Sequence, residues 1–296
     1  MMKHSFQITL VLVCMFLLAQ FIGLSVIEHY IDRTSGVPTY NALPYGLEPP
    51  PIDENYGWIF ITVGVLIGTG LVLVLMKFRR FNVWRVWFFL SALMTMGVAF
   101  SAFINQWIAI VLAGILSFFK VFRPNFIIHN VTELFIYGGL AAIFVPILNI
   151  FSVVILLLLI SVYDAYAVWK SKHMVSMAKF QAESKIFAGF LIPKSEKVVK
   201  ESPKKSLKRI KIAVPEKTPA YALLGGGDVA FPLLFAGVVL KSTGFVPLLF
   251  VIPICTAIAL LGLLYFGEQG KFYPAMPFLS AGTFIGYFIF LFMNGF

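Results

Sequence analysis

Long apolar runs follow one another along the chain, with few polar positions between them. A helix needs about 20 apolar residues to cross the hydrocarbon core of a bilayer. On that criterion the pattern predicts an all-α polytopic membrane protein with nine transmembrane helices, whose two termini lie on opposite sides of the membrane. The predicted spans are 6-30, 57-77, 83-104, 106-121, 125-147, 150-169, 221-240, 245-266 and 274-294.

Two segments interrupt this pattern. The loop from Ile31 to Tyr56 contains five prolines, which favour extended or turn structure, and we expect it to form a partly ordered cap. The loop 170-220 is rich in Lys and Ser, a composition typical of flexible solvated chain. Near its end, Ile210 to Val214 alternates apolar and polar residues like a short strand. The chain therefore divides into a six-helix part (1-169), a basic loop (170-220) and a three-helix part (221-296).

The composition agrees with a membrane protein and decides its orientation. Of the 296 residues, 60% are hydrophobic and 12% are charged, against about 25% charged in a soluble domain. Cytoplasmic loops of membrane proteins carry an excess of Lys and Arg. If the N-terminus is cytoplasmic, 21 of the 23 Lys and Arg lie on that side. We therefore expect a cytoplasmic N-terminus, an extracytoplasmic C-terminus, a location in the cell membrane among its lipids, and no nucleic-acid partner.

Two aspartates lie inside predicted spans. Asp164 lies in 150-169, and Asp228 follows three glycines in 221-240. A carboxylate in hydrocarbon costs roughly 3 kcal/mol on insertion scales, so such residues usually face a polar interior and serve a function. If both segments are helical, the two lie roughly 8 and 10 Å from the inner ends of their helices. At matching depth on successive antiparallel helices, the carboxylates can meet if each helix is suitably rotated.

The chemistry of such a pair is specific. Two close carboxylates in a low dielectric share one proton, so that one can activate water while the other polarises a carbonyl. Gly225, Gly226 and Gly227 each weaken a helix by about 1 kcal/mol relative to Ala, and they leave room for a peptide backbone near Asp228. A third element, Pro274-Ala275-Met276-Pro277, begins the last span on the same side of the membrane, and its prolines fix an extended or kinked entry.

Other polar and small residues receive simpler interpretations. Glu133 is expected to have a helix-terminal or packing role. Gly64 with Gly68, and Gly282 with Gly286, are spaced for close helix packing. The four histidines (His4, His29, His129 and His173) lack metal-ligand spacing, so no metal or other cofactor is expected.

Taken together, the three elements resemble the presenilin and signal-peptide-peptidase family of intramembrane aspartyl proteases. Tyr163-Asp164 looks like the family's Tyr-Asp motif, and Gly225 to Asp228 looks like its Gly-x-Gly-Asp motif. Pro274 to Pro277 looks like its Pro-Ala-Leu-Pro motif, with Met276 in the place of Leu. The order and spacing of the motifs and the nine-span topology also agree. The resemblance is strongest to a compact microbial, archaeal presenilin homologue, because the loop between the two aspartates holds 13 basic residues against four acidic ones, which fits the presenilin orientation.

The resemblance implies a presenilin-like fold and cleavage of single-span membrane proteins near the inner membrane face, without accessory subunits. The unwound substrate needs a hydrogen-bonding partner in lipid, and Ile212 within Ile210 to Val214 is the expected strand partner. The implied catalytic residues are Asp164 and Asp228, and the implied substrate-binding residues are Tyr163, Leu224, Gly225, Gly226, Gly227, Ile212, Pro274, Ala275, Met276 and Pro277.

One other class of function stays open on the sequence alone. Paired intramembrane acids also occur in channels and in cation- or proton-coupled transporters, where they bind an ion or relay protons. The lack of internal repeats argues only mildly against this alternative. A purely structural scaffold would leave two uncompensated acids without explanation.

Overall fold

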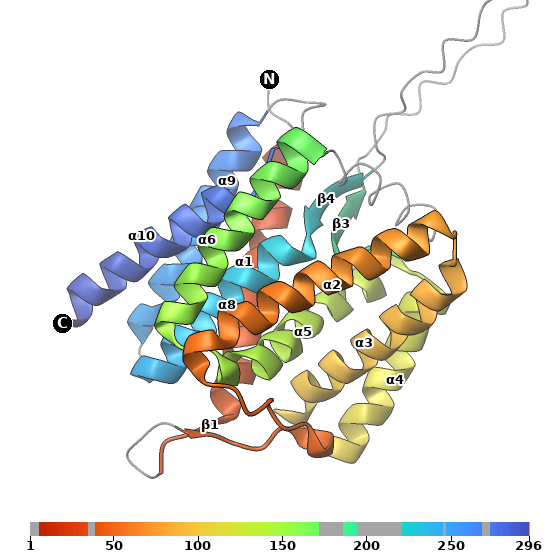
Figure 1. The fold of residues 1–296 in the computed structure, drawn as a ribbon, viewed down its shortest axis with the longest axis horizontal. Helices are drawn as coiled ribbons and strands as arrows, with labels where there is room; N and C mark the ends of the chain where they lie inside the picture. The colour runs from red at the N-terminus through yellow and green to blue at the C-terminus, as the bar shows by residue number, and fades with distance from the viewer. Residues whose placement is uncertain are drawn as a thin grey trace, which may run out of the picture.

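The structure is a computed structural model that describes residues 6–34, 39–171, 186–193, 221–244, 247–267 and 273–295. These residues form nine α-helices and two small antiparallel sheets (Figure 1). The helices are α1 (Phe6–His29), α2 (Gly57–Lys77), α3 (Phe81–Ser101), α4 (Gln106–Phe122), α5 (Phe126–Phe144), α6 (Ile150–Tyr166), α8 (Gly226–Thr243), α9 (Val251–Phe266) and α10 (Met276–Asn294). The strands are β1 (Ile31–Asp32), β2 (Thr39–Tyr40), β3 (Gly189–Pro193) and β4 (Tyr221–Gly225).

The nine helices coincide with the nine predicted spans, apart from their ends. Seven of them are long and apolar enough to cross a membrane. These seven are α1, α2, α3, α5, α6, α9 and α10, of which α2, α5, α6 and α9 are lengthened by an adjoining 3-10 or π turn. Helix α4 has 17 residues without such an extension, and α8, which begins with two glycines and Asp228, is not among the seven. The number of spans and the sidedness of the termini therefore stay predictions. The all-α class needs one correction, since β3 and β4 pair at the start of α8.

Three asparagines mark where consecutive helices begin after short junctions. The side chains of Asn105, Asn125 and Asn149 each accept a hydrogen bond from a backbone N–H in the first turn of the helix that follows. Asn is among the best N-cap residues, because its carbonyl oxygen satisfies a donor that has no partner within the helix. Three consecutive helices thus begin directly after an uncharged polar cap.

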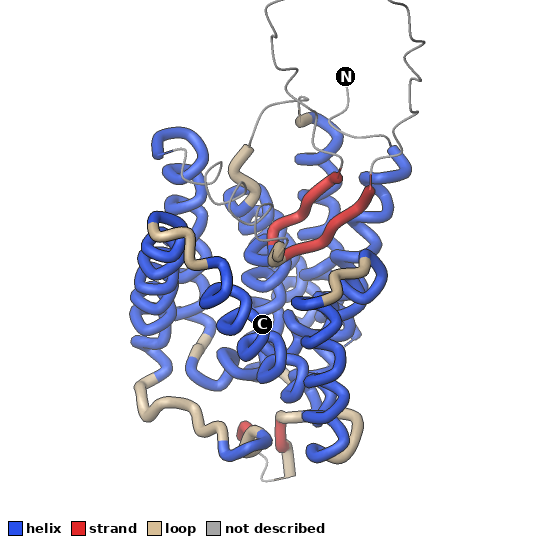
Figure 2. The backbone as a smooth tube through the Cα atoms, turned by 90° about the vertical axis from the view of Figure 1, so that its right-hand side faces the viewer, coloured by secondary structure: helices blue, strands red, loops and turns tan. Residues whose placement is uncertain are grey.

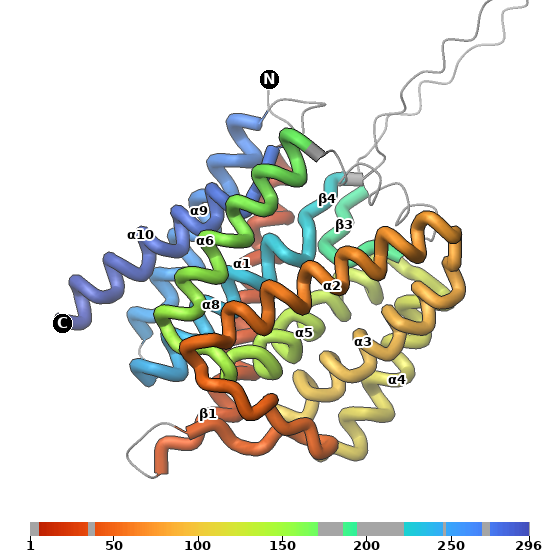
Figure 3. The backbone as a smooth tube through the Cα atoms, viewed as in Figure 1, coloured from red at the N-terminus to blue at the C-terminus, as the bar shows by residue number. Residues whose placement is uncertain are grey.

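The core of the bundle lies around α1, α5 and α8, which contact one another (Figure 3). Helices α3 and α4 flank this core on one side, and α9 and α10 flank it on the other. Helix α2 lies outside, with only 11% of its apolar window buried against 56% for α5. The lipid-facing position of α2 explains its uniformly apolar sequence.

The predicted glycine packing is half right. A methyl group at Gly286 would lie 2.7 Å from Cα of Ile252, so Gly286, like its neighbour Gly282, lets α9 and α10 approach closely. A methyl group at Gly64 or Gly68 would meet nothing within 4 Å. These two glycines lie on the outer helix α2, where they contribute no close contact in the structure.

The two sheets lie at opposite ends of the bundle (Figure 2). Strands β1 and β2 belong to the predicted cap, whose described residues are ordered by hydrogen bonds of Tyr40 Oη to Ala142 O (3.0 Å) and Tyr45 Oη to Gln106 O (2.8 Å). At this end Lys241, in the last turn of α8, donates to Glu54 Oε2 at 2.8 Å. The opposite end of α8 carries Asp228 and the β3–β4 hairpin.

Candidate active site

Asp164 lies two residues before the end of α6, and its side chain is buried at 8% exposure. One carboxylate oxygen, Oδ2, accepts a hydrogen bond of 3.0 Å from the backbone N–H of Met276. One turn earlier on α6, the hydroxyl of Ser161 lies 2.8 Å from that of Ser280 on α10. Two polar contacts therefore hold α6 against α10 at the level of Asp164.

The predicted proline element provides the donor that Asp164 uses. Met276 is the first residue of α10, so its N–H has no partner within the helix. Pro277 lies in the first turn, where its missing N–H costs little, and Ala275 is the N-cap. The N-terminus of a helix carries a partial positive charge that favours a nearby carboxylate. The start of α10 thus stabilises Asp164 within the apolar bundle.

Asp228 also lies at a helix N-terminus, which corrects the predicted span 221-240. Residues Tyr221–Gly225 form β4, and α8 begins only at Gly226 with Gly225 as its N-cap. The physical reason is that consecutive glycines disfavour helix, while the preceding residues gain a strand partner. Because a strand rises about 3.3 Å per residue against 1.5 Å in a helix, Asp228 is farther along the path from Tyr221 than the helical estimate assumed.

The three glycines differ in what surrounds them. A methyl group at Gly225 would lie 3.1 Å from Oδ2 of Asp228 itself. At Gly226 it would lie 3.0 Å from the hydroxyl of Tyr137, which is buried on α5. At Gly227 the nearest side chain, Phe231, is 3.6 Å away, an ordinary contact. Space is thus tight at Gly225, beside Asp228, and at Gly226, beside Tyr137, whereas Gly227 has room for a methyl group.

Strand β3 is not among the elements that the sequence predicts. It lies within the loop predicted to be flexible, and it pairs antiparallel with β4 so that Phe190 is opposite Leu224 and Gly189 is opposite Gly225. The hairpin is joined to α8 by the N–H of Gly226, which donates to Ala188 O at 3.1 Å. A signal was present in the sequence, since Gly189–Pro193 is an apolar run bounded by glycine and proline.

The other predicted substrate residues fall in different places. Leu224 is buried at 4% exposure, so its side chain packs in the core, whereas Leu223 beside it is 42% exposed. Tyr163 is exposed on α6 next to Asp164. Ile212 lies outside the described residues. On β4 the exposed side chain is therefore that of Leu223, and the substrate-binding role expected for Leu224 stays a prediction.

The two aspartates lie on helices that contact each other. Helix α6 contacts both α8 and α10, and α6 runs towards the hairpin end of the bundle while α8 runs away from it (Figures 1 and 3). Asp164 near the end of α6 and Asp228 at the start of α8 are each held at the N-terminal turn of a helix. The two carboxylates thus lie on contacting helices, and Asp228 follows strand β4 by three residues.

Comparisons with known proteins identify the family and the fold of the chain. Residues 13–296 match the family described as signal-peptide peptidase, presenilin aspartyl protease. Two solved structures of a presenilin family intramembrane aspartate protease, in C222 and P2 space groups, superpose with TM-scores of 0.63 and 0.62. Both are 19% identical to this chain and cover 96% of it, and the match spans 99% and 97% of those chains. Comparison with curated proteins gives no match.

Proposed function

The chain belongs to the signal-peptide peptidase and presenilin family of aspartyl proteases, and from this premise we propose that Asp164 and Asp228 are its catalytic pair. The protein is a multi-pass integral membrane protein and an intramembrane-cleaving aspartic endopeptidase. The observation that carries the proposal is that both carboxylates lie on contacting helices and each lies at a helix N-terminus. A helix end supplies the polar environment that a carboxylate needs inside a membrane.

In the proposed reaction, the ionised carboxylate takes a proton from water while the water oxygen attacks the carbonyl carbon of the scissile bond. The protonated carboxyl donates its proton to the carbonyl oxygen, which gives a tetrahedral diol. The C–N bond then breaks, the nitrogen leaves with a proton from the first carboxyl, and the second carboxylate recovers its proton from the diol. The products are a carboxylic acid and an amine, and the pair returns to its starting state.

The substrate is proposed to be a single membrane helix that unwinds beside β4. Successive residues of a paired strand direct their backbone groups to opposite edges. The N–H of Gly226 bonds towards β3, so the backbone groups of Gly225 and Leu223 point to the other edge. A substrate strand added there would satisfy its own backbone groups and approach Asp228. This edge takes the place of Ile210 to Val214, which lie outside the described residues.

The test is cleavage of a single-span peptide by the pure chain in lipid vesicles, with new termini identified by mass spectrometry. Asp164→Asn and Asp228→Asn should each abolish all products, and activity of the unmodified chain alone would support action without accessory subunits. Asp53→Asn is the matched control, because Asp53 caps a short turn outside the bundle and Asn caps equally well. Cleavage that survives in either variant refutes the pair. Ion flux that both variants lose, without proteolysis in the unmodified chain, would favour the transporter.

A further inference from the structure

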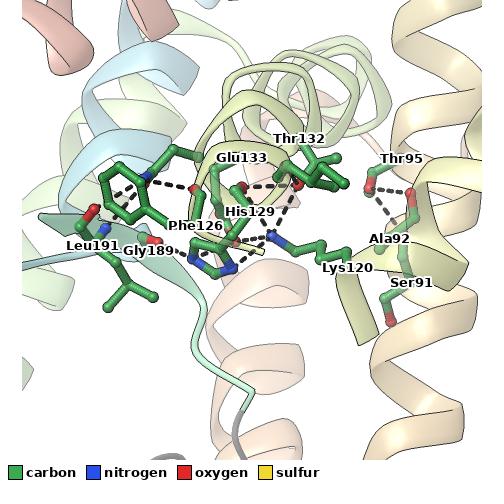
Figure 4. A network of polar contacts seen from close by, with 12 residues as sticks. Ser91, Ala92, Thr95, Lys120, Phe126, His129, Thr132, Glu133, Gly189 and Leu191 are labelled. Atoms are coloured by element: carbon green, nitrogen blue, oxygen red, sulfur yellow. Dashed lines mark hydrogen bonds and ion pairs between the residues drawn. The ribbon is translucent and has the colours of Figure 1, made fainter. Parts of the chain in front are cut away.

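A buried polar cluster that the proposed reaction does not use joins α4, α5 and β3 (Figure 4). Lys120 on α4 is 3% exposed and Glu133 on α5 is 1% exposed, and Lys120 Nζ lies 2.7 Å from Glu133 Oε1. The same ammonium donates to Thr132 Oγ1 at 3.1 Å and lies 3.3 Å from Nδ1 of His129. Glu133 is therefore half of a buried ion pair, more than the terminal or packing residue expected from the sequence.

The ion pair fixes how His129 bonds. An ammonium group has donors only, so Nδ1 of His129 must accept from Lys120. In the neutral imidazole the proton then resides on Nε2, which lies 2.8 Å from the carbonyl oxygen of Gly189 in β3. Lys120 thus selects the tautomer in which His129 donates to the hairpin.

The next residue on α5 binds the same strand. Nδ2 of Asn130 donates to Leu191 O at 2.8 Å, and Oδ1 of Asn130 accepts from Leu191 N at 3.0 Å. A side-chain amide paired in both directions with one residue mimics a neighbouring strand. Asn130 and His129 therefore occupy the edge of β3 that faces away from β4, at the alternate residues Leu191 and Gly189.

The hairpin transmits this placement to Asp228. Strand β3 pairs with β4 throughout its length, and Ala188 O binds the N–H of Gly226, the first residue of α8. Only one residue, Gly227, separates this bond from Asp228. Tyr137, two turns beyond His129 on the same face of α5, contacts Phe190 edge to face and lies against Gly226. Helix α5 thus contacts β3 from Gly189 to Leu191 and also the start of α8.

We infer that His129 and Asn130, held by the Lys120–Glu133 pair, are positioning residues that set the place of β4 and Asp228 relative to the substrate. This inference rests on the proposed function. A buried ion pair seldom adds net stability over an apolar pair of equal volume, so its presence is better explained by the geometry that it specifies. His129 and Asn130 occupy one edge of β3 and β4 occupies the other. Within the described hairpin, the outer edge of β4 is therefore the one left for substrate addition.

The experiment compares reconstituted full-length variants for kcat, KM, the positions of the new termini and thermal unfolding. In Asn130→Leu and His129→Leu, kcat per folded molecule should fall roughly fivefold to twentyfold, and cleavage should spread to bonds adjacent to the normal one. His129→Gln retains a donor at the position of Nε2 and should restore most of the rate and the normal termini. Thr256→Val is the control, since it removes a buried hydrogen bond of 2.9 Å to Thr283 far from the hairpin.

A purely structural role would lower the amount of folded protein in Asn130→Leu as in Thr256→Val, with unchanged termini and an unchanged rate per folded molecule. That result overturns the inference, as does His129→Gln behaving like His129→Leu. If Asn130→Leu does not fold, Asn130→Asp replaces it, because the carboxylate still accepts from Leu191 N but cannot donate to Leu191 O. Normal termini and a normal rate in Asn130→Asp would also refute the positioning role of Asn130. Loss of all products in the aspartate variants tests the proposed function separately.

Discussion

The contact between Gly225 and Asp228 gives the sharpest test of the site. In Gly225→Ala the new methyl carbon would lie 3.1 Å from Oδ2 and 3.7 Å from Cγ of Asp228. To accommodate the methyl group, the carboxylate must shift by a few tenths of an ångström or the Asp228 side chain must turn about χ1, which costs about 1 kcal/mol. Misplacement of a catalytic group by about 1 Å can lower a rate a hundredfold. We expect a fall in kcat of about tenfold.

Stability should change in the opposite direction. Gly225 has φ −64° and ψ 146°, a conformation that alanine adopts without strain. Replacing such a glycine stabilises a protein by about 0.4–1 kcal/mol, because the unfolded chain loses freedom. The midpoint of thermal unfolding in detergent should therefore stay the same or rise while activity falls. A variant that was only misfolded would lose both.

The assay is initial-rate cleavage of a single-span reporter in vesicles, with unfolding measured on the same preparations. Gly70→Ala is the matched control, because its methyl group would meet nothing within 4 Å on the outer helix α2 and alanine favours the helix. We expect Gly70→Ala to retain nearly the full rate. A normal rate in Gly225→Ala, or equal losses in the two variants, would refute the claim that Gly225 is required by the carboxylate.

Two further predictions concern the strand edge and the helix packing. Leu223→Pro removes an N–H from the outer edge of β4 and leaves the hydrogen bonds to β3 intact. KM for the reporter should therefore rise at least fivefold, while the midpoint of unfolding changes little. An unchanged KM in steady-state kinetics would argue against substrate addition at this edge. Gly286→Ala brings a methyl group within 2.7 Å of the Ile252 backbone and should lower the free energy of unfolding by about 1–3 kcal/mol. Gly68→Ala, whose methyl group would meet nothing within 4 Å, should leave the free energy of unfolding unchanged. Equal effects of the two substitutions in denaturant titrations would contradict the packing of α9 on α10.

The helices were predictable because the bilayer acts on each segment separately. A span must be apolar over about 20 residues wherever it lies in the bundle, so a local count finds it. The two aspartates were equally predictable, since a carboxylate within an apolar run is rare whatever surrounds it in the fold. The same applies to the proline element, whose residues fix a helix start by their own geometry. These features depend on the residue and its neighbours in the chain.

The features that failed depend on contacts between distant segments. Tyr221–Gly225 is a strand because Gly189–Pro193 pairs with it, and the apolar residues of either segment alone fit a buried helix as well. Lys120 is buried against Glu133, which lies thirteen residues later, and no local pattern indicates that contact. The sequence likewise leaves open which of Leu223 and Leu224 faces the core, since only the pairing of β4 decides it.

The sequence by itself determined the membrane class, the helices and the identity of the two acids, because hydrocarbon imposes its demands residue by residue. The tertiary structure decided where those acids lie: Asp164 against the N-terminus of α10, and Asp228 at the end of a hairpin held by α5. Such placement results from hydrogen bonds between segments up to 112 residues apart. No local pattern specifies those bonds, since each backbone donor and acceptor is the same in every residue until the fold selects its partner.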